Sequence, residues 1–307
     1  MRDRCVELLA PSISSSANPV FVDATLGLGG HTEALLTRFE NLTVIGIDRD
    51  KSALEKATAR LAPFGDRLKT AHCVFDEITE VVQSFGFTHT NGALFDLGVS
   101  SMQLDESERG FSYSQDAPLD MRMDRSKGIT AYEIVNSYEP GKLVKILRTY
   151  GEEKFATRIV ENIVKARAIA PLNSTTELAT LVKESIPAAT RRTGGNPAKR
   201  TFQALRIETN DELGAVNRAI PQALELLKVG GRLVVMSFQS LEDRIVKEIF
   251  TQATTSGTPR DLPIDLPEFA AKFALVVRGS VLPSEAEIAA NSRAQSVRLR
   301  AIERLAA

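Results

Sequence analysis

The chain has 307 residues, 43% of them hydrophobic and 25% charged, an ordinary balance for a globular protein that buries a sizeable core. Its 38 basic and 39 acidic residues give a formal net charge of −1, so binding of a polyanion requires a local basic cluster. Two cysteines exclude a disulfide framework and a four-cysteine zinc site, and no apolar run reaches the ~18 residues of a membrane span. We therefore expect a cytoplasmic protein with no membrane partner.

The first hundred residues alternate between short apolar runs and amphipathic patterns. We predict strands at residues 19–24, 42–47, 70–74 and 93–97, with one helix that begins near His31 and another at 51–61. Nearly apolar strands that alternate with helices are typical of a parallel sheet covered on both faces. The predicted fold class is therefore α/β, with a doubly wound sheet.

The alternation stops after about residue 104. Residues 105–128 are polar and predict a long loop, whereas apolar residues between 131 and 186 recur at helical spacing. Residues 190–200 form a basic, turn-rich linker. This whole stretch predicts an all-helical domain at residues 105–205, inserted into the α/β domain.

The α/β pattern then resumes. Thr209 and Glu212 fit a capping box that starts a helix, and Gly230 and Gly231 are predicted to end it. Further expected elements are a strand at 232–237, a helix at 241–250 and weaker strands near 273–278 and 297–299. Residues 1–104 and 206–307 together are therefore predicted to form one discontinuous domain.

A glycine-rich turn follows the first predicted strand. Gly27, Gly29 and Gly30 allow the backbone to approach a ligand closely. Asp48 ends the second strand about 20 residues later, the spacing at which an acid reaches the ribose of an adenosine cofactor. A nicotinamide-dependent oxidoreductase is the rival interpretation, but Thr32 stands where the dinucleotide fingerprint has its last glycine.

The fourth strand also ends in polar residues. Asp96, Ser100, Ser101 and Gln103 are expected to face the same crevice as the glycine turn, because ligands of open α/β sheets bind outside the carboxyl ends of the strands. A carboxylate that accepts a proton from a weakly nucleophilic amine promotes attack by that amine. Asp96 could serve this role, with Ser100 and Ser101 as further catalytic candidates, or it could hold the cofactor.

Seven segments together carry a resemblance to a known family. They are D-A-T-L-G-L-G-G-H-T (23–32), I-D-R-D (47–50), D-L-G-V-S-S-M-Q-L-D (96–105), G-F-S-Y (110–113), D-A-P-L-D-M-R-M-D (116–124), F-Q-A-L-R-I (202–207) and S-L-E-D-R-I-V-K (240–247). They resemble the RsmH/MraW family of bacterial 16S rRNA (cytosine-N4)-methyltransferases, from Asp23 to about Arg300. The resemblance implies a Rossmann-like class I methyltransferase whose inserted helical domain recognises RNA.

The resemblance also implies a cofactor, a substrate and a set of contacts. The cofactor is S-adenosylmethionine, and the substrate is a cytosine of 16S rRNA, in the small ribosomal subunit, methylated on its exocyclic N4. The implied cofactor-binding residues are Gly29, Gly30, His31, Asp48, Phe75, Asp96 and Gln103. No metal is expected, since the three histidines lack ligand spacing, and a homodimer is left open. A DNA or protein methyltransferase and a non-catalytic RNA-binding protein are the remaining alternatives.

This chain departs from the family pattern in three places. The family's short N-terminal H-x-P-V segment is absent, and its S-F-H-S reads S-F-Q-S here, with Gln239 in place of histidine. No aromatic residue directly follows Asp96, so Phe111 and Tyr113 become candidates for stacking on the target base. Segment 116–124 contains three further charged residues, Asp120, Arg122 and Asp124. They could bind the edge of the target base, as the resemblance favours, or they could form an ion-pair network.

Basic residues gather in two segments. Residues 186–210 contain Arg191, Arg192, Lys199, Arg200 and Arg206 against the single acid Glu208. The C-terminal segment adds Arg293, Arg298, Arg300 and Arg304. Such clusters bind phosphates without sequence preference, so both are predicted to contact RNA.

Overall fold

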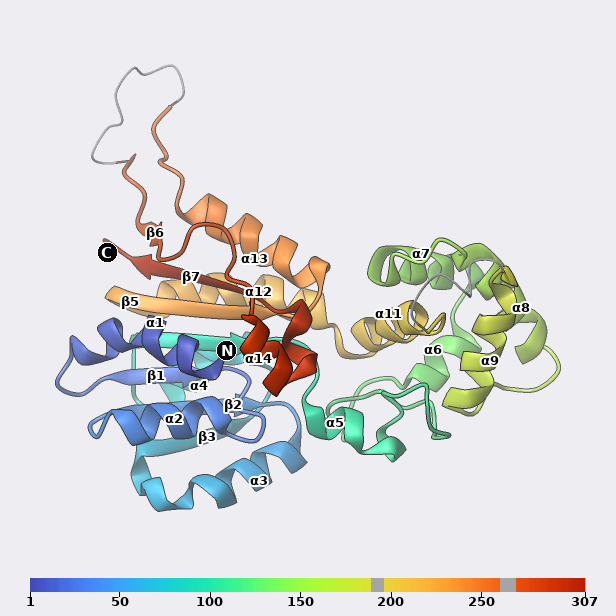
Figure 1. Cartoon of the computed structure of the whole chain (residues 1–307), viewed down its shortest axis with the longest axis horizontal. Helices are drawn as coiled ribbons and strands as arrows, with labels where there is room; N and C mark the ends of the chain where they lie inside the picture. Colours follow the sequence, from blue (N-terminus) through green and yellow to red (C-terminus); the bar gives the residue numbers. More distant parts are fainter. Residues whose placement is uncertain (189–195, 260–268, 307) are drawn as a thin grey trace. The chain divides into compact units, whose positions relative to one another are not determined.

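The computed structural model describes residues 1–188, 196–259 and 269–306, which form two compact units (Figure 1). The first unit comprises Met1–Gly98 and Leu213–Ala307, and the second comprises Val99–Glu212. The predicted helical insertion at residues 105–205 falls within the second unit.

The first unit is built on a seven-stranded sheet with the order β3-β2-β1-β4-β5-β7-β6. The strands are β1 (Val20–Asp23), β2 (Thr43–Asp48), β3 (Leu68–His72), β4 (Thr90–Asp96), β5 (Leu227–Ser237), β6 (Phe273–Leu275) and β7 (Arg298–Arg304). Strands β1 to β5 are parallel, whereas β7 runs antiparallel between β5 and β6. The strand order reverses between β1 and β4, which is where open α/β sheets bind ligands. The predicted α/β, Rossmann-like fold is confirmed.

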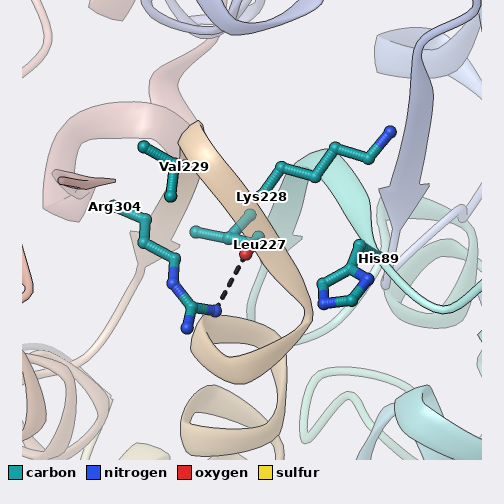
Figure 2. A pocket seen from close by; sticks show the side chains of 5 residues that line it. All are labelled: His89, Leu227, Lys228, Val229 and Arg304. Atoms are coloured by element: carbon teal, nitrogen blue, oxygen red, sulfur yellow. Dashed lines mark hydrogen bonds between the residues drawn. The ribbon is translucent and has the colours of Figure 1, made fainter. Parts of the chain in front are cut away.

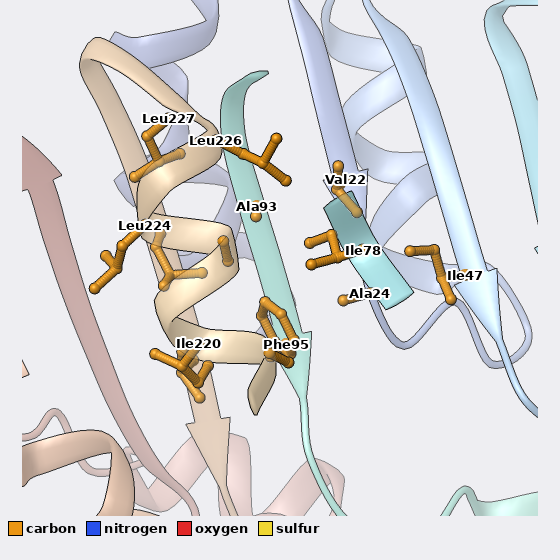
Figure 3. Packing of buried hydrophobic residues seen from close by; sticks show 14 of the residues in the cluster. Val22, Ala24, Ile47, Ile78, Ala93, Phe95, Ile220, Leu224, Leu226 and Leu227 are labelled. Carbon is orange, nitrogen blue, oxygen red and sulfur yellow. The ribbon is translucent and has the colours of Figure 1, made fainter. Parts of the chain in front are cut away.

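Helices cover both faces of this sheet. One face packs against α1 (Arg2–Ser14) and α2 (Gly30–Arg38), and the other against α4 (Ile78–Ser84), α12 (Glu212–Leu226) and α13 (Ser240–Ala253). Helices α3 (Lys51–Leu61) and α14 (Glu285–Ala290) and the 3₁₀ turns η1 (Ala62–Arg67), η2 (Phe75–Glu77) and η5 (Ser292–Ser296) complete the unit. Neighbouring residues of β1 face opposite sides, Phe21 toward α1 and α2 and Val22 toward the core around Phe95 and Ile220 (Figure 3).

The second unit is helical. Its helices are α5 (Ser101–Asp105), α6 (Ala131–Ser137), α7 (Pro140–Gly151), α8 (Ala156–Arg167), α9 (Thr175–Ser185) and α11 (Lys199–Asn210). They pack around a separate apolar core that includes Ile134, Leu147, Ile159 and Phe202. The predicted loop at 105–128 is irregular apart from the end of α5 and the short turn η3 (Ser107–Arg109). Residues 189–195 of the predicted linker lie outside the described residues.

Two predicted helix boundaries are wrong. Thr209 lies inside α11 and does not cap the next helix; the break comes at Asp211, whose φ of 48° is left-handed. Glu212 instead accepts two hydrogen bonds from Arg206. Gly230 and Gly231 do not end a helix, because α12 already ends at Leu226 and the glycines lie within β5. The β4–β5 ladder shifts register at this point, between Thr90 and Gly92, and this irregularity accommodates them.

Other differences have similar local causes. Helix α1 was not predicted, because Glu7 and Pro11 interrupt its apolar pattern, but Leu9 and Ile13 bury it against the sheet. Strand β3 begins two residues earlier than predicted, because it is a half-buried edge strand with a weak apolar pattern. Among the described residues, no helix is long and apolar enough to cross a bilayer.

Candidate cofactor and catalytic site

The turn between β1 and α2 has two glycines with different roles. Gly29 caps α2 with φ of +78°, and a Cβ there would lie 2.7 Å from Leu61 Cδ1, so the fold itself requires glycine. At Gly30 a Cβ would meet nothing within 4 Å. The fold therefore does not require glycine at position 30, and the open space beside it suits a ligand that approaches the first turn of α2.

Asp48 joins this turn to the end of β2. Its Oδ2 accepts the backbone N–H of Gly27 at 2.7 Å, and its Oδ1 accepts that of Asp50 at 2.8 Å. Burial raises the pKa of Asp48, and the two backbone hydrogen bonds oppose this shift. Each carboxylate oxygen can still accept a second hydrogen bond, so the predicted contact with ribose hydroxyls is chemically possible.

Asp23, which the sequence interpretation did not assign, anchors both ends of the same turn. It is buried at the end of β1, where Oδ2 accepts the Thr32 hydroxyl at 2.7 Å and Oδ1 accepts the Thr25 N–H at 3.3 Å. Burial raises the pKa of Asp23 to about 6. The signal that could have found it is a carboxylate at the last position of an otherwise apolar strand, directly before the glycine turn.

Asp96 ends β4 beside the first turn of α2. Its Oδ2 lies 3.9 Å from His31 Nδ1, which is too long for a hydrogen bond. Burial, reinforced by the charges of Asp23 and Glu242, raises the pKa of Asp96 to about 7. Burial lowers the pKa of His31 to about 4, so this imidazole is neutral at physiological pH. The two side chains are therefore not an ion pair.

Two polar atoms at this position have no partner. Asp96 Oδ1 and His31 Nε2 are buried, and neither makes a hydrogen bond with the described residues. Unsatisfied buried groups are destabilising and rare, and a polar ligand that completes them relieves this penalty. Together with the open space at Gly30, these atoms fit an amphipathic ligand bound at the carboxyl ends of β1 and β4.

Phe75 begins η2, directly after β3. It packs edge-on against Phe95, with the ring centroids 5.6 Å apart and the planes at 80°. The ring is half-buried, so part of it remains available to a ligand. The predicted contact between Phe75 and adenine stays a prediction.

Ser100 and Gln103 belong to the second unit. They form a capping box at α5, in which Ser100 Oγ accepts the Gln103 N–H at 3.2 Å and Gln103 Oε1 accepts the Ser100 N–H at 3.1 Å. The prediction for the side chain of Ser101 lies outside what the structure describes. The predicted catalytic and cofactor roles of these three residues therefore stay predictions.

Gln239 has a structural position at the start of α13. It forms a capping box with Glu242, and its Nε2 donates to Glu242 Oε1 at 2.9 Å. Glu242 is buried and also accepts the backbone N–H of Phe238. The other amide atom, Gln239 Oε1, is buried and has no hydrogen-bond partner among the described residues.

The charged residues of segment 116–124 form an ion-pair network, the second of the two alternatives. Arg122 donates to both oxygens of Asp120, at 2.7 and 3.1 Å, and Asp124 accepts the backbone and hydroxyl hydrogen bonds of Ser126.

The two aromatic candidates for stacking on the target base both pack within the second unit. Phe111 is 7% exposed and belongs to the core of this unit, so the prediction that it stacks on a base is wrong. Tyr113 packs edge-on against Phe202.

A shallow pocket lies at the opposite end of the parallel strands from Asp96. Its volume is about 240 Å³. It is lined by His89, Leu227, Lys228, Val229 and Arg304 (Figure 2). It adjoins the amino ends of β4 and β5, whereas Asp96 lies at the carboxyl end, so the pocket is not the candidate cofactor site. Among the described residues, no three His, Cys, Asp or Glu side chains are placed to hold a metal ion.

The reversal of strand order at β1 and β4, the antiparallel β7, the glycine turn and the strand-end acids define a class I methyltransferase fold. The model of the MraW methylase family matches residues 1–305, and the chain belongs to this family.

Two relatives and one solved structure illustrate what this chain is similar to. The Ribosomal RNA small subunit methyltransferase H of Renibacterium salmoninarum is 56% identical, covering 99% of this chain and 93% of that protein. The protein of the same name from Mycolicibacterium smegmatis is 55% identical, covering 99% and 82%. An rRNA methylase from Streptococcus thermophilus has a crystal structure that aligns with a TM-score of 0.44 and 13% identity, covering 98% and 95%.

Proposed function

We propose that this protein transfers a methyl group from S-adenosylmethionine to the exocyclic N4 of a cytosine in 16S rRNA of the small ribosomal subunit. The observation that carries the proposal is a carboxylate, Asp96, at the end of β4 beside a glycine turn suited to an adenosine cofactor. Membership of the MraW methylase family and the names of the relatives support methylation of small-subunit ribosomal RNA.

The proposed cofactor contacts come mainly from the first unit. Asp48 accepts the ribose hydroxyls, Phe75 packs beside the adenine, and Gly30 and His31 line the first turn of α2. When bound, S-adenosylmethionine supplies an activated methyl group carried by a sulfonium. The buried, unpartnered His31 Nε2 and Asp96 Oδ1 support a polar ligand at this position.

Asp96 serves as the acceptor for the target amine. The N4 lone pair of cytosine is delocalised into the ring, which makes the amine a poor nucleophile. A hydrogen bond from N4–H to the Asp96 carboxylate localises that lone pair, and Asp96 holds the proton released as the methyl group is transferred. His31 cannot accept this proton at neutral pH because its pKa is lowered to about 4. The target base reaches the site by extrusion from its stack.

The rate of methyl transfer should depend on the ionisation of Asp96. Because burial raises the pKa of Asp96 to about 7, the carboxylate form accumulates only as the pH rises through that value. Single-turnover rates at saturating cofactor should therefore rise with pH around a midpoint near 7. Asp23, whose pKa is raised to about 6, titrates partly in the same range. A rate that stays flat between about pH 6 and pH 8 contradicts the acceptor role.

Several arginines of the two predicted RNA-binding clusters already have partners within the protein. Arg206 pairs with both oxygens of Glu212, at 2.7 and 2.9 Å. Arg300 pairs in the same way with Asp243 at 2.7 and 3.0 Å. Arg304 donates to the carbonyl oxygens of Glu225, in the last turn of α12, and of Leu227, the first residue of β5. Arg300 and Arg304 of the C-terminal cluster thus have structural partners, whereas Arg293 and Arg298 are exposed and their contact with RNA stays a prediction.

A basic surface on the second unit includes two residues of the cluster predicted at 186–210. Lys145 and Arg148 are exposed on α7, and Lys199 and Arg200 are exposed at the start of α11. The two helices approach closely, since a Cβ at Gly151 would lie 2.6 Å from the Arg200 carbonyl oxygen. We call these four residues the α7–α11 basic surface and propose that it contacts RNA phosphates. Arg191 and Arg192, also predicted to bind RNA, lie outside the described residues.

Replacing Lys145, Arg148, Lys199 and Arg200 together with alanine should weaken binding of ribosomal substrate. Each lost phosphate contact should flatten the logarithmic salt dependence by about 0.7 to 0.9, because fewer counterions are released. Cofactor affinity should not change. The matched control replaces Lys165 and Lys183, exposed lysines of the same unit, and should retain the wild-type slope. An unchanged slope in the quadruple variant would show that the surface is merely solvated.

The function itself can be tested with labelled cofactor and small subunits from a strain that lacks this enzyme. Nucleoside mass analysis should find the label in N4-methylcytidine. Label in DNA, in protein or in another nucleoside would assign a different methyltransferase activity. RNA binding without any methyl transfer would indicate a non-catalytic protein, and thermal stabilisation by NAD but not by S-adenosylmethionine would indicate an oxidoreductase.

A further inference from the structure

We propose that Thr25 is a positioning residue for Asp96, which links the glycine turn of the cofactor site to the acceptor of the amine proton. The proposal deepens the function proposed above and rests on it. It stands on one hydrogen bond, in which the backbone N–H of Asp96 donates to Thr25 Oγ1 at 2.7 Å.

This hydrogen bond takes the place of a backbone hydrogen bond between β1 and β4 at the point where β1 has ended. The last register pair between β1 and β4 is Asp23 with Leu94, and Ala24 adds one further backbone hydrogen bond, to the Leu94 carbonyl oxygen. Beyond this point β1 has ended, while β4 continues to Asp96. On the other side, the Leu97 N–H donates to Met236 of β5. The Asp96 N–H therefore has no strand to pair with, and the side chain of Thr25 accepts it.

The same threonine belongs to the cofactor turn. Its backbone N–H donates to Asp23 Oδ1, and Asp23 Oδ2 in turn accepts the hydroxyl of Thr32 in α2. Both threonines thus fix the turn through Asp23, but only Thr25 also bonds to Asp96. The Thr25 hydroxyl therefore couples the position of the turn to the backbone of Asp96. Thr32 provides a matched comparison within the same network.

Thr25→Val keeps the shape of the side chain and removes the acceptor, whereas Thr25→Ser keeps the hydroxyl. At saturating cofactor and RNA, Thr25→Val should lower the single-turnover rate by about 10- to 100-fold, because small misplacements of a reacting group have effects of this size. Thr25→Ser should restore most of the rate. Thr32→Val should instead weaken cofactor binding, and its rate should recover when cofactor is saturating.

Amide hydrogen exchange gives a readout that does not depend on methylation. In the cofactor-free protein, Thr25→Val should speed exchange in the segment 93–98 about tenfold, while Thr25→Ser should leave it protected. Unchanged protection in Thr25→Val overturns the link, whichever reaction the enzyme performs. If Thr25→Val does not fold, the Thr25→Ser variant decides. Loss of amide protection in segment 93–98 of folded Thr25→Ser also overturns the link between Thr25 and Asp96. A third outcome separates the two proposals. If amide protection depends on Thr25 but the enzyme does not methylate cytosine, the proposed function and the rate effect are both refuted. Only the structural link between Thr25 and Asp96 then remains.

Discussion

Asp96→Asn should lower the single-turnover rate of methyl transfer by about 100- to 10,000-fold, the usual contribution of a positioned general base. The substitution keeps the shape of the side chain but removes the anionic acceptor for the amine proton. Affinity for S-adenosylmethionine, measured by calorimetry, should change little. Asp66→Asn, an exposed aspartate of the same unit, is the matched control and should retain the wild-type rate.

The alternative role of Asp96 predicts a different result. If Asp96 only holds the cofactor, Asp96→Asn should raise the dissociation constant, and saturating cofactor should restore the full rate. Such a rescue would mean that another group contacts the target amine, and Ser100 and Ser101 remain the predicted candidates.

Stability measurements should show that a loss of rate in this variant is not a loss of fold. The pKa of Asp96 is raised in the folded protein. Between about pH 4 and pH 7, Asp96 is therefore protonated in the folded protein and ionised in the unfolded chain. The free energy of unfolding contributed by this group is therefore fully present at low pH and is lost as the pH rises through 7. Asp96→Asn lacks this dependence, so it should be at least as stable as the wild type above pH 7.

Asp48→Ala should weaken binding of S-adenosylmethionine by roughly 100-fold or more. Two charge-assisted hydrogen bonds to the ribose would be lost, each worth about 1.5–3 kcal/mol. The carboxylate also holds the backbone of Gly27 and Asp50, so the alanine variant loosens the glycine turn as well. The fold should survive, because the apolar residues of β2 are buried on both faces of the sheet.

Two comparisons separate the effects of charge and support. Asp48→Asn keeps an acceptor oxygen for one backbone N–H but loses the charge, so its affinity should lie between those of the wild type and Asp48→Ala. Glu55→Ala, an exposed acid on α3, should bind the cofactor normally. Unchanged affinity of Asp48→Ala in calorimetry would remove the ribose assignment.

Elements that are buried on both faces were the most predictable part of the fold. β1, β2 and β4 each contain an apolar run that located the strand, although β4 begins at Thr90, three residues before the predicted start. Boundaries set by contacts between distant residues were not predictable. Thr209 reads as a helix cap, but α11 continues through it because Phe202 and Ile207 are buried along the helix. Gly230 reads as a helix end, but β5 accommodates it through an irregular ladder.

The candidate site shows the same division. Gly29, Asp48 and Asp96 follow strands, so their positions at one edge of a parallel sheet could be predicted. The roles of Asp23 and Thr25 depend on hydrogen bonds to α2 and to β4, and no local pattern reveals these partners. Phe111 was a candidate for stacking on the target base because no aromatic residue follows Asp96, but it is buried in the core of the second unit.

The discontinuity of the first unit has a consequence for the order in which the protein folds during synthesis. β5 pairs with β4 along the middle of the sheet, yet the whole second unit separates them in the chain. While the ribosome produces that unit, β4 presents an unpaired, apolar edge, and such edges promote aggregation. The helical unit has its own core and can fold before the sheet is complete. The nascent chain thus passes through a stage with a finished insertion and an unpaired edge at β4. That stage ends when Leu227–Ser237 emerges, and the sheet is complete only after Arg298–Arg304 has followed.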